Sequence, residues 1–327
     1  MIKRFFFILP GMLVLALLLA SCSSAAAPTS TAPSKTPTAA LGDASISSIT
    51  LAAKSNGATF HTPLDSTPNV DATMIYFTAT GSHGSGVFRV PAAGGAVTEV
   101  FAGSPFVTPR ALAFSPDGTE LVIADPAAGK TGELFTLAAT GGTPSPIPGS
   151  LGSAPENLNV YDQNGQSLVY FTGKDPKSGQ PAVLSLPTGG ASAPTVLVKG
   201  TPLLAPDGIV VTPSGVIYVA DRGTGDQGKV FKIEGTTLTA VVNQIHTGNP
   251  AGIALSPDAS LLLVSAYQPA SSFDEVFLIN LTTLQTGAAT RVVGQNSYAG
   301  GLHASSGDKE VLSWADTQGT IYRVRFP

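Results

Sequence analysis

A repeated apolar strand constrains the fold of this chain more than any other feature of its sequence. Six short apolar runs recur, with gaps of 46, 48, 48, 45 and 50 residues between their last members. These last members are Phe77, Ile123, Phe171, Val219, Val264 and Trp314. A period in the range of roughly 40 to 50 residues is typical of propellers and solenoids, so we expect one of these two architectures.

A second apolar run in each repeat gives the same period independently. Its second residues are Phe88, Phe135, Leu184, Phe231, Phe277 and Tyr322, separated by 47, 49, 47, 46 and 45 residues. Because the two landmarks agree, we interpret the repeat as a structural unit.

Each unit consists of strands. In the fourth unit, short apolar runs over 208–211, 216–219, 230–233 and 238–242 are separated by clusters of Gly, Pro, Asp and Ser, as in an antiparallel meander. The helical period of apolar residues is missing, which excludes helical-repeat solenoids. The sequence therefore predicts an all-β fold, a six-bladed β-propeller of four-stranded antiparallel blades.

The two ends of the repeat array predict how the ring closes. The last unit stops at residues 325–327, directly after its third strand, and a spare β-like run over 46–51 precedes the first unit. Donating this N-terminal strand to the last blade would remove two exposed sheet edges. We therefore expect one propeller domain over residues 44–327.

Recurrent aspartates have structural interpretations. Asp117 and Asp258 stand in turns between the first two strands of a blade, where Asp and Gly favour a tight reversal. Asp125, Asp221 and Asp316 follow the second strand, and we expect them to accept hydrogen bonds from loop amides within each blade.

The N-terminus has the pattern of an export signal. Lys3 and Arg4 precede an apolar run over 5–20, and small residues follow it. The sequence therefore predicts a signal peptide over residues 1–21.

Leu19-Ala20-Ser21-Cys22 resembles the lipobox of bacterial lipoproteins, in which the cysteine is acylated and becomes the mature N-terminus. The resemblance implies a lipid anchor, such as palmitate, on Cys22. An ordinary secretory signal and an uncleaved membrane anchor are the alternatives. Residues 22–43 are rich in Ser, Ala, Thr and Pro, so we expect them to form a disordered tether.

These features predict a monomer that is exported and held at a membrane of the bacterial cell envelope. Ser23 follows the cysteine, where inner-membrane retention signals usually carry Asp, which favours the outer membrane if the organism has one. With a formal net charge of -4 and scattered Lys and Arg, the chain lacks the clustered basic charge of a nucleic-acid-binding protein.

Ligand chemistry is expected where the innermost strands reach the central channel. Aligning the repeats there places one residue from each blade at one mouth: Asn56, Arg110, Glu156, Asp207, Ala251 and Gly300. Glu156 and Asp207 could hold Ca²⁺ or another divalent metal, with Asn56 or Asn157 as neutral oxygen donors. Alternatively, Arg110 pairs with Glu156 in a structural ion pair, or the ring binds a small polar ligand. The residues leave these three readings open.

Two histidines give a further candidate. His61 and His303 fall on the expected innermost strands of the first and last blades, which would be neighbours in a closed ring. A paired-histidine site is one reading, and two partly buried, hydrogen-bonded histidines are the other.

Several blades resemble those of known propeller families. The segments 206–211, 216–223 and 250–258 resemble blades of the SMP-30/gluconolactonase and NHL-repeat propellers. The first three blades, with the segments 75–78 and 88–95, are equally similar to the repeats of TolB-type periplasmic propellers.

The gluconolactonase resemblance implies a channel metal held by a Glu, an Asn and an Asp, with the Asp also acting in lactone hydrolysis. Asp207 matches this catalytic Asp, but Ala251 occupies the next slot and Glu156 lies in the blade just before Asp207. Two functions are therefore expected from the sequence. The first is an envelope lipoprotein whose propeller binds a protein, glycan or small ligand. The second is a Ca- or Zn-dependent lactonase.

Overall fold

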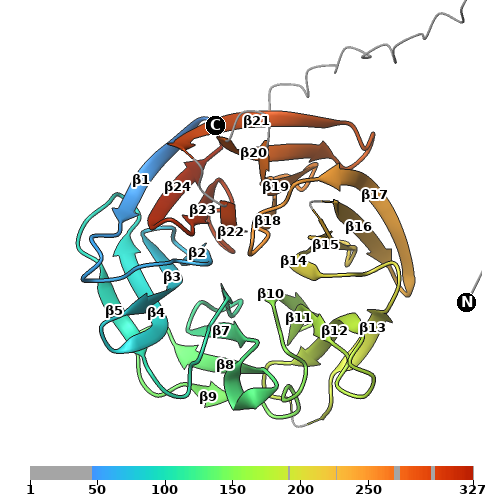
Figure 1. Cartoon of the computed structure of the whole chain (residues 1–327), viewed down its shortest axis with the longest axis horizontal. Helices are drawn as coiled ribbons and strands as arrows, with labels where there is room; N and C mark the ends of the chain where they lie inside the picture. Colours follow the sequence, from blue (N-terminus) through green and yellow to red (C-terminus); the bar gives the residue numbers. More distant parts are fainter. Residues whose placement is uncertain (1–45, 191, 226, 269–272, 296–298, 327) are drawn as a thin grey trace, which may run out of the picture. The chain divides into compact units, whose positions relative to one another are not determined.

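The computed structural model describes residues 46–190, 192–225, 227–268, 273–295 and 299–326. These residues form six four-stranded antiparallel sheets, arranged as blades around a common centre (Figure 1). The predicted six-bladed β-propeller is therefore confirmed.

The first three blades take consecutive strands from the centre outward. Blade 1 contains β2 (Ser66–Pro68), β3 (Met74–Gly81), β4 (Gly84–Pro91) and β5 (Thr98–Ala102). Blade 2 contains β6 (Ala111–Phe114), β7 (Glu120–Asp125), β8 (Glu133–Ala138) and β9 (Ser145–Pro146). Blade 3 contains β10 (Asn157–Gln163), β11 (Gln166–Lys174), β12 (Pro181–Pro187) and β13 (Thr195–Lys199).

The last blade differs from the others in its outermost strand. Blade 4 contains β14 (Pro206–Val211), β15 (Ile217–Asp221), β16 (Gly228–Glu234) and β17 (Thr237–Ile245). Blade 5 contains β18 (Ile253–Leu255), β19 (Leu261–Gln268), β20 (Phe273–Asn280) and β21 (Thr286–Gln295). Blade 6 contains β22 (Ala299–Ala304), β23 (Val311–Asp316), β24 (Thr320–Arg325) and β1 (Ser48–Lys54).

Helix is almost absent from the described residues, which include one short 3₁₀ turn, η1 (Ala128–Lys130). Accordingly, no helix in the described ranges is long and apolar enough to cross a membrane. The predicted signal peptide, Cys22 and the tether lie outside the described residues, so these remain predictions.

The core lies at the seams between blades. Six clusters of buried apolar side chains each join two adjacent blades. Alternation along a strand explains this arrangement: Ile75 and Phe77 pack toward blade 6, whereas Tyr76 between them packs toward blade 2. A central strand is therefore buried on both faces, which is why the repeated runs are almost continuously apolar.

The ring closes through pairing of the N-terminal strand with the last strand. β1 runs antiparallel to β24, from Ser48 opposite Arg325 to Lys54 opposite Thr320, with one bulge near Leu51. The pairing gives blade 6 its fourth strand, as the sequence predicts.

The recurrent aspartates have the expected structural roles. The Asp117 carboxylate accepts hydrogen bonds from the Ser115 hydroxyl and the Thr119 amide, at 2.6 and 3.0 Å. The fully buried Asp125 and the nearly buried Asp221 accept hydrogen bonds from loop amides. These are the amides of Val107, Thr108, Ala127 and Ala128 for Asp125, and of Leu204, Ala205 and Gly223 for Asp221. Asp316 accepts one from the Gln318 amide.

Removing β1 should destabilise the propeller. A chain that begins at residue 56 loses the β1–β24 ladder and exposes the edge of β24. We expect its free energy of unfolding to fall by about 3 kcal/mol or more, and aggregation to increase, relative to a chain that begins at residue 44. Denaturant unfolding of both chains measures the difference, and equal stabilities would contradict the closure.

Candidate functional site

The channel has two mouths, which are defined by the direction of the innermost strands. These strands begin at the N-terminal mouth and end at the C-terminal mouth. Strand pairing places Leu64, Arg110, Glu156, Asp207, Ala251 and Gly300 at equivalent positions of the N-terminal mouth, each two residues before a residue paired with the repeated landmark.

The predicted alignment thus holds for blades 2 to 6 but not for blade 1, where Leu64 takes the position that the alignment gave to Asn56. Asn56 is exposed in the connection between β1 and β2, and its Oδ1 accepts hydrogen bonds from the amides of Ala58 and Thr59 at 3.0 and 2.9 Å. The physical reason is the closure of the ring. Because β1 belongs to blade 6, the chain must cross from the rim to the centre before blade 1 begins. Asn56 therefore does not join the other candidate residues.

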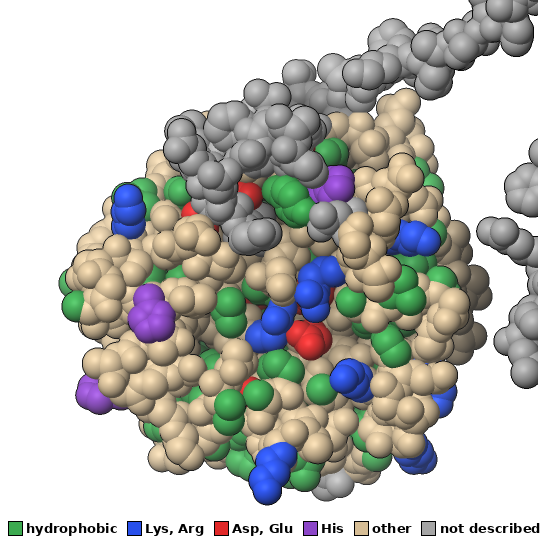
Figure 2. Space-filling view, in the orientation of Figure 1, with side chains coloured by type: hydrophobic (Ala, Val, Ile, Leu, Met, Phe, Trp, Pro, Cys, Tyr) green, Lys and Arg blue, Asp and Glu red, His purple; other side chains and the backbone are tan. Residues whose placement is uncertain are grey.

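Five polar side chains meet at the N-terminal mouth, and we refer to them as the mouth cluster: Arg110, Glu156, Asp207, Arg222 and Asn249. Arg110 Nε lies 2.9 Å from Glu156 Oε2, and Arg110 Nη2 lies 3.3 Å from Asp207 Oδ2. Arg110 Nη2 also donates to Asn249 Oδ1 at 2.8 Å. Arg222 Nε lies 2.9 Å from Asp207 Oδ2. Figure 2 shows basic and acidic side chains side by side at the centre of the ring.

The two carboxylates of the mouth cluster are held in place by arginine. Asp207 is fully buried, and its Oδ2 also accepts a hydrogen bond from the Ala251 amide at 3.1 Å. Burial raises the pKa of Glu156, Arg110 lowers it, and the negative charge of Asp207 raises it further. The cluster combines two guanidinium groups with two carboxylates, as expected for a structural ion-pair network.

Sequence reasoning missed Arg222 and Asn249. Arg222 follows the end of β15, which pairs antiparallel with β14, so that Pro206 lies opposite Asp221. The end of the second strand of a blade therefore lies beside the beginning of its innermost strand. Antiparallel pairing alone would have placed Arg222 near Asp207. Asn249 carries no comparable signal, because it stands in a connection between blades.

The mouth cluster does not fit the divalent metal that the gluconolactonase resemblance implies. Arginine nitrogens lie 2.9 Å from both Glu156 and Asp207, where a metal cation would have to bind. Asn157, a predicted neutral donor, is buried, and its Oδ1 accepts a hydrogen bond from the Leu158 amide at 2.7 Å. In the described part of the chain, His, Cys, Asp and Glu side chains form no group of three suited to a metal.

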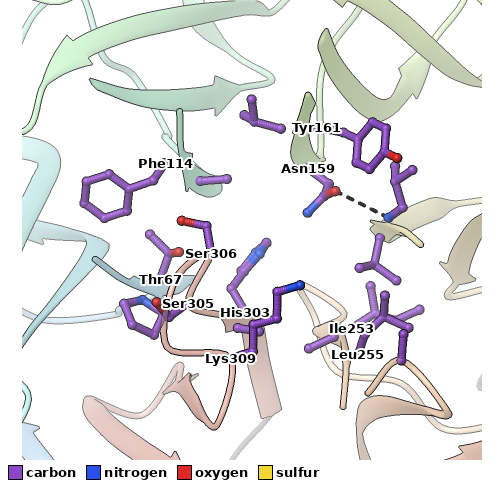
Figure 3. Close-up of a pocket in the computed structure, with 18 of the residues that line it drawn as sticks. Thr67, Phe114, Asn159, Tyr161, Ile253, Leu255, His303, Ser305, Ser306 and Lys309 are labelled. Atoms are coloured by element: carbon purple, nitrogen blue, oxygen red, sulfur yellow. Dashed lines mark hydrogen bonds between the residues drawn. The ribbon is translucent and has the colours of Figure 1, made fainter. Parts of the chain in front are cut away.

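A cavity of about 340 Å³ opens at the C-terminal mouth (Figure 3). Its wall is formed by the ends of innermost strands and by the turns that follow them. Polar side chains such as Thr67, Asn159 and Lys309 alternate with apolar ones such as Phe114 and Leu255. The repeat pattern did not predict this cavity, because the aligned polar residues stand where the innermost strands begin.

His303 lies in the wall of this cavity and is paired with a buried carboxylate. His303 Nε2 lies 3.0 Å from Asp65 Oδ2, which also accepts a hydrogen bond from the Leu112 amide at 3.0 Å. Asp65 is fully buried and fits there because Gly301 has no side chain: a Cβ at that position would overlap Asp65 Oδ1. His61 is exposed and bonds Thr62 instead, so the two histidines do not form a paired site.

Comparison with known proteins shows the fold. No protein-family model matches the sequence, and no curated protein is similar to it in sequence. Among solved structures, the chain is similar to a PQQ-bound aldose sugar dehydrogenase from Streptomyces coelicolor, with 11% identity, a TM-score of 0.60 and coverage of 86% of this chain and 98% of that one.

Two further solved structures represent the families that the blades resemble. A TolB-type protein from Agrobacterium tumefaciens has 17% identity, a TM-score of 0.58 and coverage of 81% of this chain and 90% of that one. A gluconolactonase from Xanthomonas campestris has 14% identity, a TM-score of 0.56 and coverage of 88% and 98%. At these identities the similarity concerns the propeller fold alone.

Replacing Arg110 tests the mouth cluster. In Arg110→Gln, Glu156 and Asp207 lose their shared cation, so we expect the free energy of unfolding at pH 7 to fall by about 1–3 kcal/mol. The pKa of Glu156 should rise further, because Arg110 is the main influence that lowers it. Since a raised carboxyl pKa favours the folded state only while the group is protonated, the loss of stability should shrink in acid and grow as the pH rises through that pKa.

Urea unfolding across pH, with NMR titration of the Glu156 carboxyl, measures both effects. Arg89→Gln is the matched control, because Arg89 donates hydrogen bonds to Thr98 and Tyr76 and pairs with no carboxylate among the described residues. An unchanged or lowered pKa of Glu156 in Arg110→Gln would contradict the ion-pair network. Excess Ca²⁺ should leave the native unfolding curve unchanged, whereas stabilisation by Ca²⁺ would favour a metal site.

Proposed function

We propose that this chain is a lipid-anchored binding protein of the bacterial cell envelope, and that the cavity at the C-terminal mouth holds a small ligand. The cavity itself is the main support for this proposal. Its volume of about 340 Å³ falls in the range of roughly 300–1,000 Å³ that is usual for small-molecule sites, and it combines apolar walls with a few inward polar groups.

The mouth cluster supports binding rather than hydrolysis as the function. A metal-dependent lactonase needs a complete set of metal ligands with an open position for water. In this chain Arg110 and Arg222 neutralise Glu156 and Asp207, so neither carboxylate is free for that chemistry. The similar solved structures do not decide the function, because one propeller fold serves many activities.

The lipid anchor is proposed from the sequence, and it has a direct test. Acylation of Cys22 would hold the propeller at a membrane surface through the tether of residues 22–43. In cells, we expect Cys22→Ser to move the protein from the membrane fraction to the soluble fraction and to abolish incorporation of labelled palmitate. A Cys22→Ser protein that stays in the membrane fraction would favour an uncleaved membrane anchor.

Blocking the cavity tests the binding site. Ser306 is exposed and lines the cavity, so Ser306→Trp places a large ring at the opening. Gln166→Trp is the matched control, because Gln166 is exposed at the corresponding turn of blade 3 and does not line the cavity. Fragments that bind the native chain in an NMR screen should bind Ser306→Trp at least about tenfold more weakly, and Gln166→Trp equally well. Unchanged binding to Ser306→Trp would show that the ligand site lies elsewhere.

A further inference from the structure

The cavity at the C-terminal mouth is unbalanced in charge. Lys309 and His303 are its basic lining residues, and no Asp or Glu is among the described residues that line it. This contrasts with the formal net charge of the chain, which is -4. The lining therefore offers a positive site within an acidic protein.

Lys309 carries this positive charge and has no ion-pair partner among the residues that the structure describes. It stands on the turn between β22 and β23, and Figure 3 shows its ammonium group directed into the cavity. Its acidic neighbours are engaged elsewhere: Glu310 Oε2 lies 3.4 Å from Arg325 Nη2, and Asp308 Oδ1 accepts a hydrogen bond from the Glu310 amide at 3.3 Å. Among the described residues, no carboxylate pairs with the Lys309 ammonium.

Other uncommitted polar groups lie on the same side of the cavity as Lys309. Thr67 comes from blade 1, whereas Ser306 comes from blade 6, which is the neighbour of blade 1 in the ring. The Thr67 and Ser306 hydroxyls make no hydrogen bond to another described residue. Ser305 is different, because its hydroxyl donates to the carbonyls of Asn69 and Val70. Two hydroxyls without a described hydrogen-bond partner thus line the cavity beside the seam between blades 1 and 6, and the Lys309 ammonium is directed into the same cavity (Figure 3).

The side of the cavity formed by blades 3 to 5 is mainly apolar, and its blade 5 part lies next to Lys309 (Figure 3). Val160, Val211, Ile253 and Leu255 come from blades 3, 4 and 5 and line this side, as Figure 3 shows for Ile253 and Leu255. The nearby Asn159 is engaged through its Oδ1, which accepts a hydrogen bond from the Val211 amide at 3.3 Å. This side can therefore bury hydrocarbon but offers few free polar groups.

We infer that the cavity binds a small amphipathic monocarboxylate, with the carboxylate group beside Lys309 and the apolar body against blades 3 to 5. The inference rests on the proposed function and specifies its ligand class. A single ammonium balances one negative charge, and the two hydroxyls add donors for carboxylate oxygens. A phosphate dianion would favour the bidentate guanidinium groups of arginine, and arginine is absent from the described lining.

The test uses three probes that share one apolar body: 4-phenylbutyrate, 4-phenylbutan-1-ol and 4-phenylbutan-1-amine. Their affinities are measured by isothermal titration calorimetry on the full chain carrying Cys22→Ser, and on the same chain with Lys309→Gln or Lys309→Arg. We expect 4-phenylbutyrate to bind at least about tenfold more tightly than the alcohol, as a charge-assisted contact provides, and the amine to bind most weakly. Lys309→Gln should remove the preference for the acid over the alcohol, and Lys309→Arg should retain it.

The outcomes separate this inference from the proposed function. Equal affinity for the acid and the alcohol in the native chain, or an unchanged preference in Lys309→Gln, would overturn the carboxylate assignment and leave the cavity as the binding site. If none of the three probes binds, and fragments bind Ser306→Trp as well as the native chain, both the carboxylate assignment and the cavity site are overturned.

Discussion

The rest of this structure depends on the pairing of β1 with β24. Without this ladder, blade 6 would end in an open edge, and blade 1 would lose the part of its packing that β1 supplies. The seam between these blades contains Ala52 and Ala53, at the end of β1, packed with Phe60 and Phe77. The ladder therefore supplies part of the core, in addition to its hydrogen bonds.

Closure also assembles one side of the proposed ligand site. Thr67 belongs to blade 1, whereas His303 and Lys309 belong to blade 6, so the polar side of the cavity exists only when these blades meet. The contact between His303 and Asp65 crosses the same seam. A ligand that touches both blades should for this reason stabilise the closed ring, since a ligand that binds only the folded state raises its stability.

The two mouths of the channel solve different physical problems. At the N-terminal mouth, the buried Asp207 and the partly buried Glu156 would be costly alone, and Arg110 and Arg222 neutralise them. At the C-terminal mouth, no carboxylate of the described residues pairs with Lys309, and the walls formed by blades 3 to 5 are mainly apolar. The first arrangement satisfies its own charges, whereas the second leaves a charge that a ligand can satisfy.

The fold could be predicted from the sequence because it depends on a local, repeated signal. Each central strand is buried on two faces, so residues such as Phe77 and Trp314 form a landmark with a fixed period. The missing strand after Phe326 likewise predicted the closure. Which side chains meet at the two mouths depends on how distant segments are aligned with one another. The period of the repeat does not fix this alignment. Because of the long connection before blade 1, Leu64 and not Asn56 takes the mouth position of that blade. Ring closure places His303 beside Asp65 rather than beside His61.

The identity of the cavity's occupant could not be derived from motifs. Lys309 stands in an irregular turn between two strands. Its proposed role in binding follows from the fact that no carboxylate of the described residues pairs with it. Arg222 and Asn249 likewise gain their roles only through contacts with Asp207 and Arg110. Which charges are paired and which distant side chains touch are properties of the tertiary structure.

The central claim is that the C-terminal mouth is the ligand site, and one measurement tests it most directly. A crystal of the protein soaked with 4-(4-bromophenyl)butyrate would locate the bromine by anomalous scattering. We expect a single strong peak against Val211 and Leu255, with the carboxylate beside Lys309. A peak only at the mouth cluster of Arg110 and Arg222, or no peak within the channel, would contradict it.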